Sequence, residues 1–163
     1  MTPIISHTDK LVLLDNTVLS NFAFARCPNL ITNLWKNCAT TSQAWNELHN
    51  GILNEKAAPG QWDGLTLLSL NSIEVAFWQT LPKMGDGESS CLAVAYHRQA
   101  IFATDDAKAR AVGNKLGLEI AGTIGFLLFA VAKQETTHQE ANRLLKKMIA
   151  NGYRSPVDDL GKI

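Results

Sequence analysis

The stretch "LVLLDNTVLSNF" at residues 11–22 decides the fold. Its first four residues, 11–14, are apolar and predict a buried strand. The apolar residues that follow Asp15 return with helical spacing, which predicts a helix directly after the strand. Asp15 therefore stands where a buried strand ends and a helix begins. It either lies in a solvated turn or holds a metal ion, and the rest of the chain has to decide between the two.

The same alternation of short apolar strands and helices continues along the chain. Further strands are predicted at 37–40, 65–70, 101–104 and 118–122. Helices are predicted between the strands and at the end of the chain, at 17–25, 28–37, 41–52, 72–81, 86–100, 105–117, 123–134 and 137–152. Residues 54–64 are polar and contain Pro and Gly, which predicts a loop. This alternation is typical of an α/β domain whose parallel sheet is covered on both faces.

Length and composition indicate one globular domain, residues 1–163, with a loosely held C-terminal tail from about residue 153. The 15 basic residues balance the 15 acidic ones, so any basic surface must be local. Three scattered cysteines, an odd number, argue against a disulfide framework and fit a reducing cytoplasm. The chain start lacks the pattern of a signal peptide, and the most apolar window, 124–132, is too short to span a membrane. We therefore expect a cytoplasmic protein with no membrane partner.

Acidic residues recur just after the predicted strands and on the helices next to them. They are Asp15, Glu47, Glu88, Asp105 and Asp106, and they come from four separate segments. Taken alone, each acid is better explained as a helix cap or a solvated side chain than as a metal ligand. The explanation weakens when the five are taken together. The carboxyl ends of parallel strands meet at one edge of a sheet, where ligands bind. Carboxylates gathered there need a cation, and their oxygens suit Mg²⁺ or Mn²⁺. Such a site activates water for phosphoryl chemistry.

Four segments together resemble the PIN-domain ribonucleases, most closely the PIN-like subgroup of toxin–antitoxin-type proteins. They are "LLDNTVLSNFA" at 13–23, "TTSQAWNEL" at 40–48, "GDGESSCLAVA" at 85–95 and "IFATDDAKARAVGNKLGLEIAGTIGFLL" at 101–128. The last two are the most specific, with G-x-G-E before an apolar helix, then T-D-D, then G-T-I-G. The order and spacing of the segments agree with the family.

The resemblance implies a three-layer α/β/α sandwich with a mostly parallel central sheet and cleavage of RNA with Mg²⁺ or Mn²⁺. It implies that Asp15, Glu47, Glu88, Asp105 and Asp106 are the catalytic acids. Among them, Asp15, Glu88, Asp105 and Asp106 would be the metal ligands. Thr17, two places after the first acid, would hydrogen-bond a ligand or a water, and the family's T-x-D pattern selects Asp106 over Asp105. Asn16 departs from the family, in which Thr or Ser is commoner at that place.

The resemblance also implies partners. Toxin-type relatives often form dimers and bind antitoxin peptides through apolar surfaces. The helical region near 17–36 carries a dense apolar set, which predicts such an exposed surface and a homodimer, with a cognate antitoxin protein as a further partner. That set consists of Phe22, Phe24, Leu34 and Trp35.

Two alternatives stay open. A catalytically degenerate PIN-like module would bind nucleic acid or a protein partner without cutting, and the neutral net charge gives it weak support. A phosphatase of the haloacid dehalogenase type shares a similar first motif in "LLDNTVL". That chemistry needs a second aspartate where this chain has Thr17.

Overall fold

The computed structural model describes residues 9–55 and 62–163. Its strands, in chain order, are β1 (Val12–Leu14), β2 (Cys38–Thr41), β3 (Thr66–Leu68), β4 (Ile101–Ala103) and β5 (Ile120–Ala121). Its α-helices are α1 (Asn16–Phe24), α2 (Asn29–Thr32), α3 (Ser42–Glu55), α4 (Ser72–Thr80), α5 (Asp86–Arg98), α6 (Ala107–Lys115), α7 (Thr123–Ala132) and α8 (His138–Ala150). A short 3-10 turn, Leu160–Lys162, follows near the end of the chain.

The described strands form one parallel sheet with the order β3-β2-β1-β4-β5. The central strand β1 aligns Val12 with Cys38 of β2 on one side and with Ile101 of β4 on the other. The chain therefore builds the sheet outward from β1 in one direction and then returns to build it in the other. The order reverses between β1 and β4, and ligands bind at such a switch, beyond the carboxyl ends of the strands.

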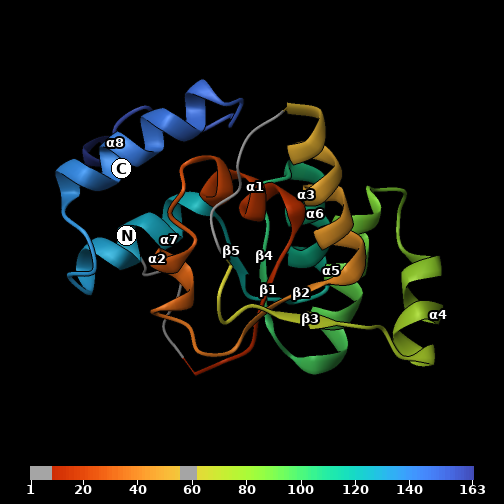
Figure 1. The fold of residues 1–163 in the computed structure, drawn as a ribbon. Coiled ribbons are helices and arrows are strands. Elements are labelled where there is room, and N and C mark those ends of the chain that lie inside the picture. The colour runs from red at the N-terminus through yellow and green to blue at the C-terminus, as the bar shows by residue number, and fades with distance from the viewer. Residues whose placement is uncertain (1–8, 56–61) are drawn as a thin grey trace.

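Helices cover both faces of the sheet, as Figure 1 shows. Helices α3, α5 and α6 lie on one side, and α2 and α7 lie on the other, with α8 packed against α7. Strands β1, β2 and β4 are buried along their whole length, as expected of a parallel sheet enclosed by helices. The edge strand β3 is mostly exposed. The predicted three-layer α/β/α sandwich with a parallel central sheet is thus confirmed.

The largest apolar side chains of α1 and of the segment just after α2 pack inward. Phe22 and Trp35 are both fully buried, and their rings meet Phe126 of α7 edge-on at centroid distances of 6.2 and 5.1 Å. Phe24 and Leu34 are half-buried. The prediction that this set forms an exposed surface is therefore wrong. Its density comes from packing against the nearly all-apolar helix α7, and the dimer prediction loses its original basis.

The C-terminal segment returns to the body of the protein. Leu160 is buried, and its backbone N–H donates to Asn142 Oδ1 of α8 at 2.8 Å. Two predictions remain untested: that the tail from about residue 153 is loosely held, and that residues 1–163 form a single domain. The central part of the predicted loop 54–64, residues 56–61, lies outside the described residues. Among the residues that are described, no helix has the length and apolar character needed to cross a membrane.

Candidate active site

Asp15 follows β1 directly and caps α1. Its backbone N–H donates to Ala103 O of β4 at 3.0 Å, so the parallel ladder continues one residue past the strand. One carboxylate oxygen, Oδ1, accepts from the backbone N–H groups of Thr17 and Val18 at 3.0 and 3.2 Å and from the Thr17 hydroxyl at 2.6 Å. These are the bonds of an N-cap, which explains why a helix begins at once after the strand.

The other oxygen of Asp15 has no such role. The side chain is fully buried, and Oδ2 has no hydrogen-bond partner among the described residues. Burial raises the pKa of Asp15 from 3.8 to about 7, whereas the nearby Thr104 hydroxyl and the hydrogen bond from the Thr17 hydroxyl lower it. The nearby charge of Asp105 adds to the rise. A buried carboxylate with an unused oxygen needs either a proton or a cation.

The Thr17 hydroxyl links the two sides of the switch point. It donates to Asp15 Oδ1 and accepts from the backbone N–H of Asp105 at 2.9 Å. Both oxygens of Asp105 are occupied in turn. Oδ1 accepts from the Thr123 N–H at 2.9 Å, and Oδ2 accepts from the Thr123 hydroxyl at 2.5 Å and from Asn21 Nδ2 at 3.0 Å. Asp105 thus ties β4 to the first turns of α1 and α7, although burial still raises its pKa.

Asp106 has a different environment. Its Oδ1 accepts from the Ala109 N–H at 2.8 Å and so caps α6, while its own N–H donates to the Thr104 hydroxyl at 3.1 Å. The side chain is half-buried, and no hydrogen bond from the described residues reaches Oδ2. Of the two adjacent aspartates, Asp106 therefore keeps an oxygen available and Asp105 does not.

Glu47 of α3 reaches across to the start of α5. Its Oε1 accepts from the Gly87 N–H at 2.8 Å, an acceptor for one of the amides left unpaired at a helix start. Gly87 is required there, since a Cβ at that position would lie 2.7 Å from Glu47 Oε2 and 2.8 Å from Asn16 Oδ1. The first turns of α1 and α5 and the side of α3 therefore meet at one point.

Glu88, one residue further along α5, is half-buried. Its Oε2 is another buried oxygen without a hydrogen-bond partner in the described structure, and the same is true of Asn16 Oδ1. Burial is the largest cause that raises the pKa of Glu88, and the charges of Glu47, Asp106 and Asp86 raise it further. Glu88 is thus electrostatically coupled to acids from α3, α5 and the end of β4.

The acids named from the sequence all lie around the switch point, in two linked groups. Asp15 and Asp105 are joined by Thr17, whereas Glu47, Glu88 and Asp106 are coupled around the first turn of α5. Within residues 9–55 and 62–163, no three His, Cys, Asp or Glu side chains are arranged so that they could hold one ion. The unpartnered oxygens of Asp15, Asn16 and Glu88 nevertheless fit a hard divalent cation, which prefers oxygen ligands.

Several residues of this region were missed by sequence reasoning. Asn21, Thr104 and Thr123 hold the aspartates in place, and Asn16 contributes an unpartnered oxygen. The G-T-I-G segment was noted as a motif, but the purpose of Gly122 was not. A Cβ there would lie 2.6 Å from Arg110 Nη1 and 2.8 Å from Asp105 Oδ1, so a larger residue would displace one or both side chains.

Comparison with known proteins supports one family. A family model described as a PIN domain matches residues 11–163, nearly the whole chain. Neither a curated protein nor a solved structure matches significantly. PIN domains are generally nucleases and typically use divalent metal ions. Because this match covers well over half of the sequence, this chain belongs to the PIN-domain family.

Proposed function

We propose that this protein is a metal-dependent endoribonuclease that hydrolyses RNA phosphodiester bonds with Mg²⁺ or Mn²⁺. One observation carries the proposal: Asp15 Oδ2, at the switch point of the sheet, is fully buried and has no partner in the described structure. A purely structural cap would leave that oxygen in solvent or give it a donor. Membership of a family of nucleases supplies the class of chemistry.

The proposed metal ligands are Asp15, Glu88 and the Asp105–Asp106 pair. Within that pair, the hydrogen bonds of Asp105 favour a positioning role, and the unused oxygen of Asp106 favours direct ligation. The chemistry that such an ion supplies is activation of water and stabilisation of the charge on the phosphoryl group.

The remaining residues of the site act on the ligands. Thr17 fixes the Asp15 carboxylate through its hydroxyl and fixes the end of β4 through the Asp105 amide. Glu47 holds the start of α5, and with it Glu88, in place through the Gly87 amide. Both residues are therefore needed for the alignment of the acids.

Cleavage of a fluorescently labelled single-stranded RNA tests the proposal. Wild type should cut it with Mn²⁺ or Mg²⁺ and should not cut it in EDTA. Asp15→Asn keeps the shape and the capping oxygen but removes a charge, so we expect a loss of roughly 100-fold or more in the rate. Glu135→Gln is the matched control, because Glu135 is exposed and lies between α7 and α8 in the sequence. This variant should cut at the wild-type rate.

Equal rates for wild type and Asp15→Asn would show that this site is not catalytic. A degenerate PIN-like binding module would then become the leading function. Among the described residues, no three His, Cys, Asp or Glu side chains are already placed to bind one metal ion, and this favours the binding module. It predicts RNA or partner binding that is unchanged by EDTA and no cleavage by any variant.

Two proposals concern partners. We propose that a cognate antitoxin protein inhibits the enzyme, as the resemblance to toxin-type proteins implies, and that the chain forms a homodimer. Because Phe22 and Trp35 are buried, a dimer would have to form through a different surface. In the described structure, the large exposed apolar side chains are Leu67 of β3, Ile73 and Val75 of α4, Tyr96 of α5 and the C-terminal Ile163.

A further inference from the structure

Two cavities adjoin the acidic site, and they share three residues, Asp105, Tyr153 and Arg154. The first, of about 330 Å³, lies between one side of α1 and the segment after α8, with Asp105 and Asp106 in its wall. The second, of about 260 Å³, lies between the ends of β4 and β5, the first turns of α6 and α7, and the same segment. The residues after α8 therefore separate two hollows that both reach the candidate active site.

This segment is fixed by the end of α8. The Tyr153 N–H donates to Met148 O at 3.0 Å, and the Gly152 N–H donates to Ile149 O at 3.0 Å. The Tyr153 ring is half-buried and packs against the core, while Arg154 is exposed. The backbone thus directs one side chain inward and the next outward, so Arg154 is presented at the rim of the site.

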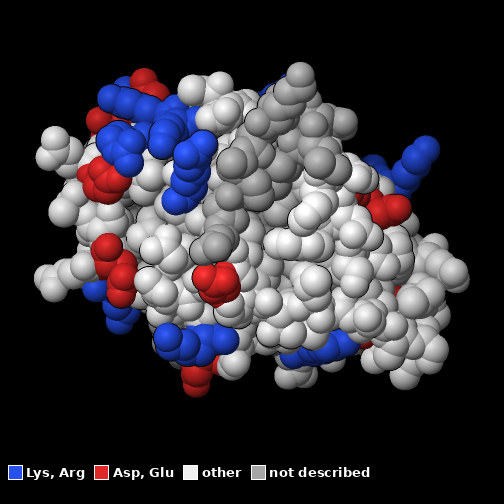
Figure 2. All heavy atoms as spheres, in the orientation of Figure 1, with Lys and Arg blue, Asp and Glu red and all other residues white. Residues whose placement is uncertain are grey.

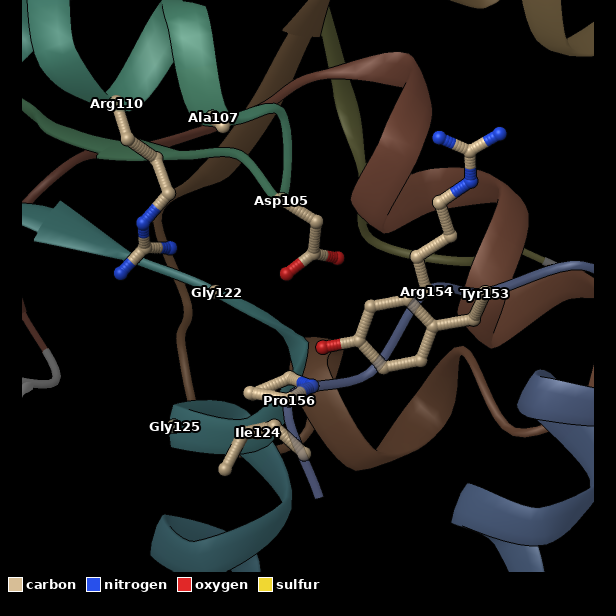
Figure 3. Close-up of a pocket in the computed structure, with 9 residues that line it drawn as sticks. All are labelled: Asp105, Ala107, Arg110, Gly122, Ile124, Gly125, Tyr153, Arg154 and Pro156. Atoms are coloured by element: carbon tan, nitrogen blue, oxygen red, sulfur yellow. The ribbon is translucent and has the colours of Figure 1, made fainter. Parts of the chain in front are cut away.

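Figure 3 shows how the side chains lie in the second cavity. Asp105 points into it, and Arg110 and Arg154 stand on either side, with the Tyr153 hydroxyl directed inward. Arg110 is anchored, because its Nη1 donates to Thr104 O at 2.8 Å. Arg154 is turned away from the Asp105 carboxylate, and no ion pair joins it to any described residue. The Arg154 guanidinium lies near the acidic site but pairs with none of its described carboxylates. It is therefore free to bind an anionic group of a ligand.

Further positive charge extends from this point. Lys146 and Lys147 are exposed on α8, and Arg143 beside them forms an ion pair with Glu140. Figure 2 shows Lys and Arg side chains gathered over the region where α8 lies, with a few acidic side chains among them. The chain as a whole is neutral, so this local grouping is a departure from its average. Exposed cations near an acidic site are the pattern expected for a polyanion that crosses the site.

We propose that the segment after α8 binds the RNA strand. Arg154 binds a backbone phosphate at the rim of the acidic site, and the cavity beside Arg110 and Tyr153 accepts the neighbouring nucleotide. A guanidinium binds phosphate oxygens through two parallel hydrogen bonds, which also orients the strand. The cavity, at about 260 Å³, falls just below the roughly 300 Å³ of the smallest drug-sized pockets and so suits a single nucleotide. The inference rests on the proposed RNA substrate.

The test measures RNA binding rather than cleavage. The Asp15→Asn protein is titrated with a short fluorescent single-stranded RNA at several salt concentrations, alone and with Arg154→Ala added. We expect Arg154→Ala to weaken binding roughly tenfold. It should also lower the slope of log affinity against log salt by about 0.7, the value for one phosphate contact in a single strand. Arg154→Lys should keep the slope but recover only part of the affinity, because an ammonium cannot form the paired bonds.

Two further variants sharpen the test. Lys115→Ala removes the same charge from the far end of α6, whose first residue lies at the site, and should leave both affinity and slope unchanged. Ile124→Phe narrows the second cavity without a change of charge and should weaken binding at an unchanged slope. Equal binding by the proteins with and without Arg154→Ala would overturn the inference, and so would equal effects of Arg154→Ala and Lys115→Ala. An acidic protein partner would then be the better candidate for this surface.

The two proposals fail in different ways. Absence of cleavage together with RNA binding that depends on Arg154 would refute the nuclease and support the strand contact. Metal-dependent cleavage together with binding that ignores Arg154 would support the nuclease and refute the strand contact.

Discussion

Replacement of Asp15 by Asn should change how the stability of the metal-free protein depends on pH. Burial raises the pKa of this carboxyl from 3.8 to about 7. Between those values the folded protein binds more protons than the unfolded chain. Stability therefore falls as pH rises through this window, and the full penalty is present above about pH 7. An asparagine does not titrate, so the variant lacks this loss.

The size of the effect follows from the two pKa values. A change from 3.8 to about 7 is a factor of more than a thousand in the ionisation equilibrium, or about 4 kcal/mol in total. Part of that loss lies below the working range of most proteins. Between about pH 5 and about pH 8, the difference in unfolding free energy between variant and wild type should grow by about 3 kcal/mol. Any cost of burying the asparagine amide is independent of pH and does not alter this growth.

Urea denaturation in EDTA at several pH values measures the difference. Glu135→Gln, which replaces an exposed glutamate, should give a curve parallel to that of wild type. Curves for wild type and Asp15→Asn that stay parallel from about pH 5 to about pH 8 would refute the reasoning, since Asp15 would then be ionised at no cost. Addition of Mn²⁺ at about pH 8 should stabilise wild type and leave Asp15→Asn nearly unchanged, because a ligand that binds only the folded state stabilises it.

Three other changes give separate tests. Thr17→Val should raise the pKa of Asp15 further and slow cleavage, whereas Thr17→Ser should do neither, and an NMR titration of the Asp15 carboxyl carbon distinguishes them. Gly87→Ala should destabilise the protein by about 1–3 kcal/mol in thermal or urea unfolding, because its Cβ meets Glu47, Asn16 and the backbone of Ala44. If the chain is a dimer through the exposed apolar residues, Ile73→Lys should give a monomer in light scattering, and an unchanged mass would exclude that surface.

The layers and the order of the elements were predictable because local pattern decides them. Strand residues such as 11–14 and 101–103 are apolar throughout, which is how a strand buried on both faces differs from a helix in sequence. The position of Asp15 was predictable for the same reason, since it is the first polar residue after a strand. The order of the strands, with β1 between β2 and β4, was not predicted, because it depends on how distant segments pair.

Contacts between distant segments were not predictable in the same way. Sequence spacing marks Phe22 and Trp35 as apolar but does not say whether the face they share meets solvent or another helix. Phe126, about a hundred residues further along the chain, settles the question by packing against both rings. Asn21 likewise contacts Asp105 and Thr123, which no local pattern connects to it. Such partners follow from the fold, and a single sequence carries no mark of them.

The two explanations offered for Asp15 from sequence alone, a helix cap and a metal ligand, apply to different atoms of one side chain. Oδ1 takes all of the capping bonds, so the helix holds the carboxylate in a single orientation. That orientation leaves Oδ2 buried and without a donor in the described structure. Asp106 repeats the arrangement at the start of α6, with one capping oxygen and one unused oxygen. A cap that immobilises the carboxylate lowers the entropy lost when an ion binds, so the structural role prepares the proposed catalytic one.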